Sequence, residues 1–168
     1  MYYNLIGLST QMQSEPVKGI FMQKKRIETV AFDFGRVLAM WDKDSQCKKF
    51  AKLSPLTAAD IHKALTISPL GKMHDAGKLS ALDFFAKAIE AAKLPQEMTF
   101  EEFSAIWRDI FSDNVGIERV LDQMDPKVKK IVVSNTDPIH FSAIKELPVM
   151  KKFFSDPKQL VLSYEVGA

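Results

Sequence analysis

Cysteine is nearly absent from this 168-residue sequence: Cys47 is the only one, so no disulfide can form within one chain. The three histidines, His62, His74 and His140, stand far apart and show none of the Cys and His spacings of zinc sites. No stretch approaches the roughly 18 consecutive apolar residues that would indicate a membrane-spanning helix. These absences exclude a disulfide scaffold, a zinc module and a membrane span, and they favour a reducing compartment.

Neither sign of charge dominates the sequence. The net charge is only +2 and the lysines are spread over many segments, so the sequence lacks the concentrated basic surface of nucleic-acid-binding proteins. Met1 to Phe21 lacks the basic start and unbroken apolar centre of a secretory signal, because Asn4 and Gly7 interrupt it. We therefore treat residues 1–26 as an N-terminal extension, and expect a cytoplasmic protein with no nucleic-acid or membrane partner.

What the sequence does contain is an apolar run that ends in a carboxylate. With 46% hydrophobic and 26% charged residues, the chain can bury the core of one domain with a modest insertion. Thr29 to Phe32 shows no polar alternation after its first residue, which predicts a strand of a parallel sheet covered on both faces. Gly35 then breaks the extended pattern. Since ligands bind beyond the carboxyl ends of such strands, Asp33 is the first candidate for chemistry.

A second strand also ends in small polar residues. Ile131 to Val133 is a β-branched run of the buried, parallel type, and Ser134, Asn135 and Thr136 follow it. Ser134 can lie beside Asp33 at the same rim of the sheet, or it can simply cap the next helix. A third short strand with a polar exit is predicted from Leu160 to the end of the chain at Ala168.

Between these strands, residues 43–114 have helical periodicity. Thr57, Ser80 and Thr99 each precede an acidic residue by three positions, which predicts three capped helix starts. Asn114 is expected to cap a further helix, which Pro126 stops. The apolar positions expected to face the core are Leu82, Phe85, Ile89 and Ala92 in one helix and Phe103, Ile106, Trp107, Ile110 and Phe111 in the next. Such stripes favour the core of a helical bundle over a substrate cage.

The residues after the first strand resemble motif one of the haloacid dehalogenase-like (HAD) hydrolases. That motif is an apolar strand followed by a nucleophilic Asp, any residue, a second Asp, Gly, Thr or Val, and Leu; here it reads Asp33-Phe34-Gly35-Arg36-Val37-Leu38. Gly35 replaces the second Asp, as in a branch similar to sugar-phosphate phosphatases, and Arg36 replaces the usual Gly. Ser134 and Asn135 resemble motif two, in which the hydroxyl binds the phosphoryl group.

The resemblance implies an α/β fold: a Rossmann-like parallel sheet core with an inserted all-helical cap. Residues 27–42 and 115–168 would form the core and residues 43–114 the cap. In the family, a run such as Ser163 to Gly167 leads to the motif-three Lys and later to an acidic motif four. The chain ends at Ala168, before both, so we expect an incomplete core. With the family strand order five-four-one-two-three, Thr29 to Phe32 would be an edge strand that dimerises, aggregates or is covered by Met1 to Phe21.

The resemblance also implies a function, which is magnesium-dependent hydrolysis of a phosphate monoester of a small metabolite. Asp33 and Ser134 would be catalytic, with Asp33 forming an aspartyl-phosphate. Ser134, Asn135 and Arg36 would hold the phosphate, and Asp33 and the Gly35 carbonyl would bind Mg²⁺. Two alternatives stay open: metal-free carbon-halogen hydrolysis through Asp33, and a non-catalytic fragment that binds phosphate or a protein partner.

Further expectations concern the rate of the reaction, the source of the leaving-group proton and the residues near the substrate. Activity should be weak or absent without the motif-three Lys and the motif-four acidic residues. Gly35 cannot protonate the leaving group, a role typically worth about 10²–10⁴-fold in rate. Another residue must therefore supply the proton, unless the leaving group is as acidic as nitrophenolate. Trp41, Asp42 and Arg36 are near enough in sequence to reach the substrate.

Overall fold

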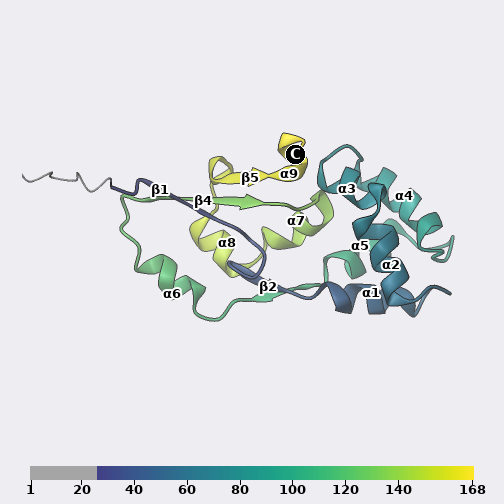
Figure 1. The fold of residues 1–168 in the computed structure, drawn as a ribbon. Helices are drawn as coiled ribbons and strands as arrows, with labels where there is room; N and C mark the ends of the chain where they lie inside the picture. Colours follow the sequence, from purple (N-terminus) through teal and green to yellow (C-terminus); the bar gives the residue numbers. More distant parts are fainter. Residues whose placement is uncertain (1–25) are drawn as a thin grey trace, which may run out of the picture.

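The computed structural model describes residues 26–168 as an elongated molecule, with a small sheet at one end and a group of helices at the other (Figure 1). The strands are β1 (Thr29–Phe32), β2 (Ala39–Trp41), β3 (Phe111–Asp113), β4 (Lys129–Ser134) and β5 (Leu160–Leu162). The helices are α1 (Lys43–Ala51), α2 (Ala58–His62), the π-helix η1 (Lys63–Ile67), α3 (Pro69–Asp75), α4 (Ala81–Ala91), α5 (Phe100–Arg108), α6 (Ile117–Asp122), α7 (Pro138–Ile144), α8 (Pro148–Phe153), the 3₁₀ helix η2 (Pro157–Gln159) and α9 (Ser163–Val166). Within these residues, no helix is long and apolar enough to cross a membrane.

The main sheet is parallel, in the order β1-β4-β5. Phe32 pairs with Val132, and Ser134 pairs with Leu162, so the three strands end at the same rim. The order matches the one-two-three part of the expected strand order. The α/β class and the parallel sheet are therefore confirmed, and the carboxyl ends of β1 and β4 lie side by side as the sequence predicts.

The prediction that β1 is covered on both faces is wrong. Thr29 and Ala31 are exposed, because β1 lies at an edge of the described sheet and helices cover only one face of it. On the covered face, buried Val132 packs in one hydrophobic cluster with residues of α7 and α8. On the open face, the side chains of Val133 and Val161 are 44% and 39% exposed. The segment Met1 to Phe21, which is one of the alternatives for covering this edge, lies outside the described residues.

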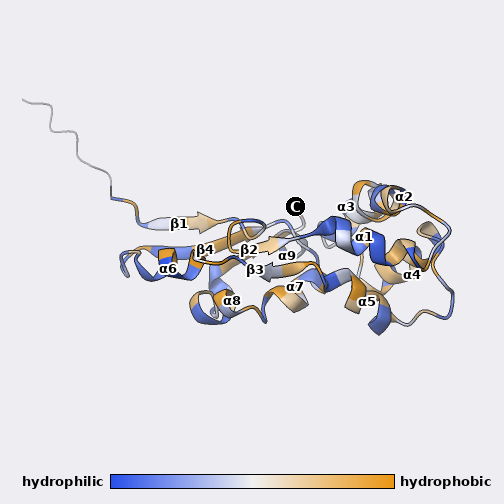
Figure 2. Cartoon of the chain, turned by 90° about the horizontal axis from the view of Figure 1, so that it is seen from below, coloured by the Kyte–Doolittle hydropathy of each residue, from blue (hydrophilic) through white to orange (hydrophobic). Residues whose placement is uncertain are grey.

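The helical region begins its helices where the sequence predicts. Thr57 and Thr99 form capping boxes with Asp60 and Glu102, and the Ser80 side chain accepts a hydrogen bond from the amide of the third helical residue. Figure 2 shows hydrophobic and hydrophilic residues alternating along α1 to α5, as expected of helices packed on one another. These helices share a core rich in aromatic rings.

The inward face of α4 differs from the predicted one. Leu82, expected in the core, is 62% exposed, whereas Phe84 is fully buried. Ile89 and Ala92 are buried as predicted. The sequence places apolar residues at both Leu82 and Phe84, and only packing against α3 and α5 decides which of them turns inward.

Residues 111–113, expected within the helical insertion, form a strand instead. Helix α5 ends at Arg108, and Phe111 pairs with Trp41 in an antiparallel ribbon of β2 and β3. Phe111 follows the apolar spacing of the helix, but it lies beyond the helix end and packs on Phe34 of the sheet region, with ring centroids 5.5 Å apart. The division into core and cap at residues 43–114 otherwise stays a prediction.

Two other local predictions are corrected. Gly116, not Asn114, is the N-cap of α6, with φ of 99°, a left-handed conformation that favours glycine. The Asn114 side chain instead donates a 2.7 Å hydrogen bond to the carbonyl of Val37. The last predicted strand is shorter than expected, because Ser163 begins the single-turn helix α9.

Candidate active site

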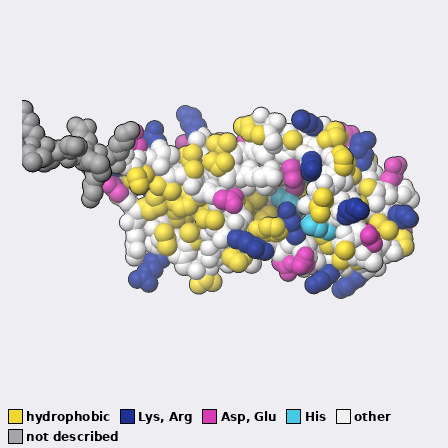
Figure 3. All heavy atoms as spheres, viewed as in Figure 1, with side chains coloured by type: hydrophobic (Ala, Val, Ile, Leu, Met, Phe, Trp, Pro, Cys, Tyr) yellow, Lys and Arg dark blue, Asp and Glu magenta, His cyan; other side chains and the backbone are white. Residues whose placement is uncertain are grey.

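A pocket of about 420 Å³ opens between the carboxyl rim of the sheet and the helical region. Its lining residues come from the turn after β1, from β2, from the end of β4 and from helices of both regions. They are Asp33, Phe34, Gly35, Arg36, Trp41, Lys43, Gln46, Leu65, Thr66, Asp75, Trp107, Ile110, Phe111, Ser134, Asn135, Thr136, His140 and Ile144. The pocket includes each residue to which the sequence assigns catalysis, phosphate binding or metal binding, namely Asp33, Gly35, Arg36, Ser134 and Asn135. Figure 3 shows acidic, basic and histidine side chains gathered around the middle of this face of the molecule.

Asp33 lies exposed at the end of β1. Its Oδ1 accepts a 2.7 Å hydrogen bond from the amide of Phe34, and its Oδ2 accepts none within residues 26–168. The turn that follows is held at the Phe34 carbonyl, which accepts from the amides of the fourth, fifth and sixth residues after Asp33 at 3.3, 2.9 and 3.2 Å. One carboxylate oxygen and the Gly35 carbonyl are therefore free of the hydrogen bonds that shape the described turn.

Ser134 faces the pocket from the end of β4. The residue is only 7% exposed, and its hydroxyl makes no hydrogen bond within the part of the chain that the structure describes. The alternative that Ser134 caps the next helix is wrong, because Asp137 is the N-cap of α7 and its side chain accepts from the amides of Ile139 and His140. The Ser134 hydroxyl is thus available to a ligand.

Two cations stand beside the indole of Trp41. The guanidinium carbon of Arg36 is 5.3 Å from the ring centroid, and Lys43 Nζ is 4.5 Å from it. Arg36 has a positive φ of 62°, a costly conformation for a residue with a side chain, which proteins often retain at ligand sites. Trp41 and Arg36 line the pocket as expected, but Asp42 does not, since its side chain caps α1 by accepting from Ser45 at 3.0 Å.

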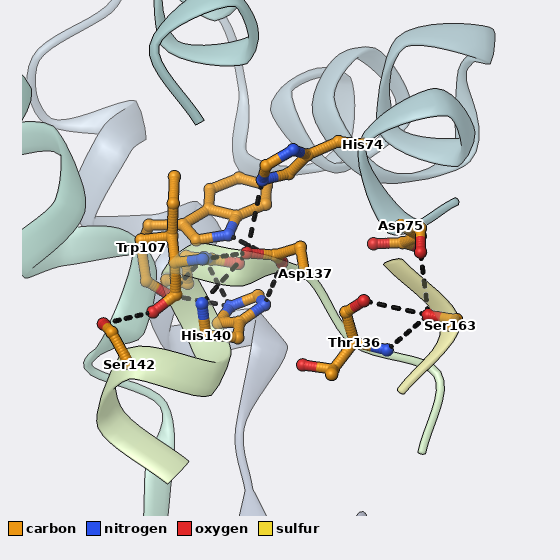
Figure 4. A network of polar contacts seen from close by, with 10 residues as sticks. His74, Asp75, Trp107, Thr136, Asp137, His140, Ser142 and Ser163 are labelled. Atoms are coloured by element: carbon orange, nitrogen blue, oxygen red, sulfur yellow. Dashed lines mark hydrogen bonds and ion pairs between the residues drawn. The ribbon is translucent and has the colours of Figure 1, made fainter. Parts of the chain in front are cut away.

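Behind the pocket, Asp137 is the centre of a buried polar network (Figure 4). Its Oδ1 accepts from the amides of Ile139 and His140 at 2.8 and 2.9 Å, and its Oδ2 accepts from the indole of Trp107 at 3.1 Å. The same Oδ2 lies 2.5 Å from His140 Nδ1, and Oδ1 lies 3.2 Å from His74 Nε2. Asp137 therefore joins α7 of the sheet region to α3 and α5 of the helical region.

Both ring nitrogens of His140 contact other protein groups. Its Nδ1 faces the Asp137 carboxylate, and its Nε2 lies 2.9 Å from the carbonyl oxygen of Trp107. Nε2 also lies 3.4 Å from Gln46 Nε2, so both ring nitrogens of His140 have polar partners inside the protein. The Gln46 side chain donates to the same carbonyl at 2.6 Å.

The charge of Asp137 is sustained by these neighbours. Burial opposes ionisation of its carboxyl group, but attraction to His140, the hydrogen bond from His140 and the close contact with His74 outweigh burial and hold the pKa well below that of an ordinary Asp. His74 is itself fully buried and stacks on Phe84, with ring centroids 3.9 Å apart. The network is therefore an ionic contact between the two regions.

Sequence reasoning assigned no role to six other polar residues of the pocket: Lys43, Gln46, Thr66, Asp75, Thr136 and His140. Thr136 follows the recognised Ser134 and Asn135 directly, so the strand-end signal could have included it. Lys43 starts the helix after β2, in a position that no pattern distinguishes. Asp75 and His140 reach the pocket only because α3 and α7 pack at the same rim, which no local signal reveals.

Asp33 and Gly35 can supply some, but not all, of the ligands of a magnesium ion. No group of three or more His, Cys, Asp or Glu side chains suited to a metal lies within residues 26–168. Asp33 offers a free carboxylate oxygen and Gly35 a free carbonyl, which are the hard oxygen ligands that Mg²⁺ prefers. Mg²⁺ commonly binds through one or two carboxylates together with water and substrate phosphate, so the pair fits it.

Comparisons with known proteins agree with the fold. The sequence matches no protein-family model and no curated protein. A HAD family enzyme from Bacteroides thetaiotaomicron, in complex with magnesium and inorganic phosphate, matches the structure with a TM-score of 0.70 at 17% identity, over 84% of this chain and 71% of that chain. A predicted HAD-like hydrolase from Porphyromonas gingivalis matches with a TM-score of 0.67 at 19% identity, over 84% of this chain and 68% of that one. This chain has the haloacid dehalogenase-like fold.

Proposed function

We propose that this chain is a magnesium-dependent phosphate-monoester hydrolase that acts through an aspartyl-phosphate on a small phosphorylated metabolite. One observation carries the proposal: Asp33 and Ser134, from the ends of adjacent parallel strands, line one pocket together with the cations Arg36 and Lys43. The magnesium and phosphate in the similar Bacteroides structure support it.

The pocket offers what phosphoryl transfer needs, which is a nucleophile and positive charge around the phosphoryl oxygens. Asp33 would attack phosphorus through Oδ2, and Oδ1, which accepts one hydrogen bond from the Phe34 amide, would keep a lone pair for the metal. The Ser134 hydroxyl and the Asn135 side chain would donate hydrogen bonds to phosphoryl oxygens, and Arg36 would contribute charge. When bound, Mg²⁺ would neutralise the phosphate, with Asp33 and the Gly35 carbonyl as its protein ligands.

The alternatives differ in measurable ways. Carbon-halogen hydrolysis through Asp33 would need no magnesium, so dependence on the metal separates it from phosphate-ester hydrolysis. A purely non-catalytic chain would bind phosphate without ever modifying Asp33. The cytoplasmic location stays a prediction.

The decisive experiment follows Asp33 itself. The chain is incubated with p-nitrophenyl phosphate and Mg²⁺, and phosphoryl transfer to Asp33 is detected by mass spectrometry alongside nitrophenolate release. Asp33→Asn should abolish the adduct and reduce the rate by several orders of magnitude, because the covalent step is lost. Asp113→Asn, which changes an exposed carboxylate of β3, is the matched control.

A second variant tests phosphate binding. Ser134→Ala should cost roughly 1.5–3 kcal/mol of transition-state stabilisation, the worth of a hydrogen bond to a charged group. Near-normal turnover by Asp33→Asn, or an adduct that forms equally without Mg²⁺, would contradict the proposed mechanism.

A further inference from the structure

The proposed reaction leaves one role unfilled, because Gly35 cannot protonate the leaving group. Trp41 explains why the usual carboxylate is absent from that position. A Cβ atom built on Gly35 would lie 2.8 Å from Nε1 and 3.2 Å from Cδ1 of the Trp41 indole. The indole therefore occupies the space into which a side chain at Gly35 would extend, and the proton must come from elsewhere in the pocket.

Five titratable side chains of the described residues line the pocket, namely Asp33, Arg36, Lys43, Asp75 and His140. Asp33 is the nucleophile, and a guanidinium does not give up its proton in proteins. Both ring nitrogens of His140 are already engaged by protein groups, Nδ1 by Asp137 and Nε2 by the Trp107 carbonyl. A lysine ammonium is ordinarily a far weaker acid than a carboxylic acid. Asp75 is the remaining carboxyl group.

Asp75 is held firmly in its place at the end of α3. Its carbonyl oxygen lies 2.7 Å from the Ser163 hydroxyl, which also accepts a 3.0 Å hydrogen bond from the amide of Thr136 beside the pocket (Figure 4). The preceding residue, His74, is fully buried against Phe84. The chain after Asp75 packs so closely on α9 that a Cβ atom at Gly77 would lie 2.0 Å from the Tyr164 carbonyl oxygen.

The surroundings of Asp75 favour its protonated form. The side chain is half-buried, and it also lines a second pocket that shares Ser134 and Asn135 with the first. Burial and the negative charge of Asp137 raise the pKa of Asp75, while Lys43, His140 and His74 partly offset that rise. An acid that keeps its proton to higher pH than an ordinary Asp is suited to this role.

We propose that Asp75, contributed by the helical region, is the proton donor for the leaving group, in place of the carboxylate that Gly35 lacks. The inference rests on the proposed phosphatase function. In the first step Asp33 attacks phosphorus, the bond from phosphorus to the leaving oxygen breaks, and that oxygen takes the Asp75 proton to become an alcohol. In the second step water attacks phosphorus, Asp75 accepts a proton from it, and the phosphate departs as Asp33 regains its carboxylate.

The test compares two leaving groups in one protein. Asp75→Asn should slow hydrolysis of an alkyl phosphate such as glycerol phosphate by about 10²–10⁴-fold, the usual worth of a general acid, but should slow p-nitrophenyl phosphate by less than about tenfold. The alkyl phosphate rate should decline at high pH because Asp75 loses its proton, and this decline should disappear in Asp75→Asn. Asp75→Glu should restore part of the rate that Asp75→Asn loses. Asp44→Asn, which removes an exposed carboxylate of α1, should leave both rates unchanged.

Two other readouts separate the possible failures. The carboxyl carbon of Asp75, followed by NMR in the unliganded chain, should titrate at higher pH than the carboxyl carbon of an ordinary Asp. One outcome is that Asp33 is phosphorylated while Asp75→Asn slows hydrolysis of both esters equally or of neither. In that case the role of Asp75 is wrong and the phosphatase function stands. If no ester ever phosphorylates Asp33, the proposed function fails, and the role of Asp75 fails with it.

Discussion

The helical region and the sheet region differ in how completely their hydrophobic side chains are buried. In the helical region, Phe50, Phe84, Phe103 and Trp107 pack on one another, with ring centroids between 4.9 and 6.3 Å apart. In the sheet region, one face of β4 and β5 packs on α7 and α8 and the other remains open. The helical region is closed around aromatic rings, whereas the sheet has a core on one side only.

The two candidate catalytic carboxylates come from these two differently packed regions. The candidate nucleophile Asp33 lies at the end of the edge strand of the less covered region. Asp75 lies on a helix that the aromatic core holds in position through His74 and Phe84. In the proposed reaction, the well-packed helical region would position Asp75 and the more open sheet region would supply Asp33.

The largest effect on stability should come from breaking the link between the two regions. Asp137→Ala would leave the buried Trp107 indole, the His140 ring and two α7 amides without their acceptor. Removing one partner of a buried ion pair costs about 3–5 kcal/mol, so urea denaturation should show a loss of that size. Thr57→Ala, which removes an exposed helix cap, should cost only about 1 kcal/mol. Equal losses in the two variants would show that the network contributes no more than a surface cap.

The next effect concerns the two cores themselves. Phe84→Ala, at a fully buried position of the helical core, should cost about 3–5 kcal/mol of unfolding free energy. Val161→Thr, on the open face of β5, should change it by no more than about 0.5 kcal/mol. Similar losses would mean that the open face of the sheet is covered in solution.

The network also predicts a pH dependence. Because the folded pKa of Asp137 lies well below its unfolded value, the charge contributes stability that is fully present above about pH 4 and is lost as the pH falls through the folded pKa. Stability should therefore fall more steeply below about pH 4 in the original chain than in Asp137→Asn. Urea midpoints measured from neutral pH downward provide the comparison, and parallel curves would contradict it.

The smallest effect should appear at the edge of the sheet. The exposed edge of β1 predicts association of two copies through this strand, which light scattering over a range of concentrations would detect. Ala31→Pro removes a backbone donor from the exposed edge and should favour the monomer. A monomer at all concentrations in both forms would contradict this association.

The sequence was most informative where the structure depends on neighbours along the chain. Asp33 and Ser134 follow apolar runs directly, so both strand ends could be predicted, as could the caps at Thr57 and Thr99. The N-cap at Gly116 could not, because it depends on a positive φ rather than on a capping side chain. Asp75 escaped prediction for a different reason, since packing of distant helices brings it to the pocket.

Helix α7 belongs to both hydrophobic cores. Ile139 is buried in the helical core, and five residues later Ile144 is buried in the core of the sheet region. Seven residues thus give the two regions a common structural element, with Asp137 at its start. Neither region can lose its core without exposing part of this helix, so the whole described chain should unfold in one cooperative transition, and the amides of α7 should be among the last to exchange with solvent.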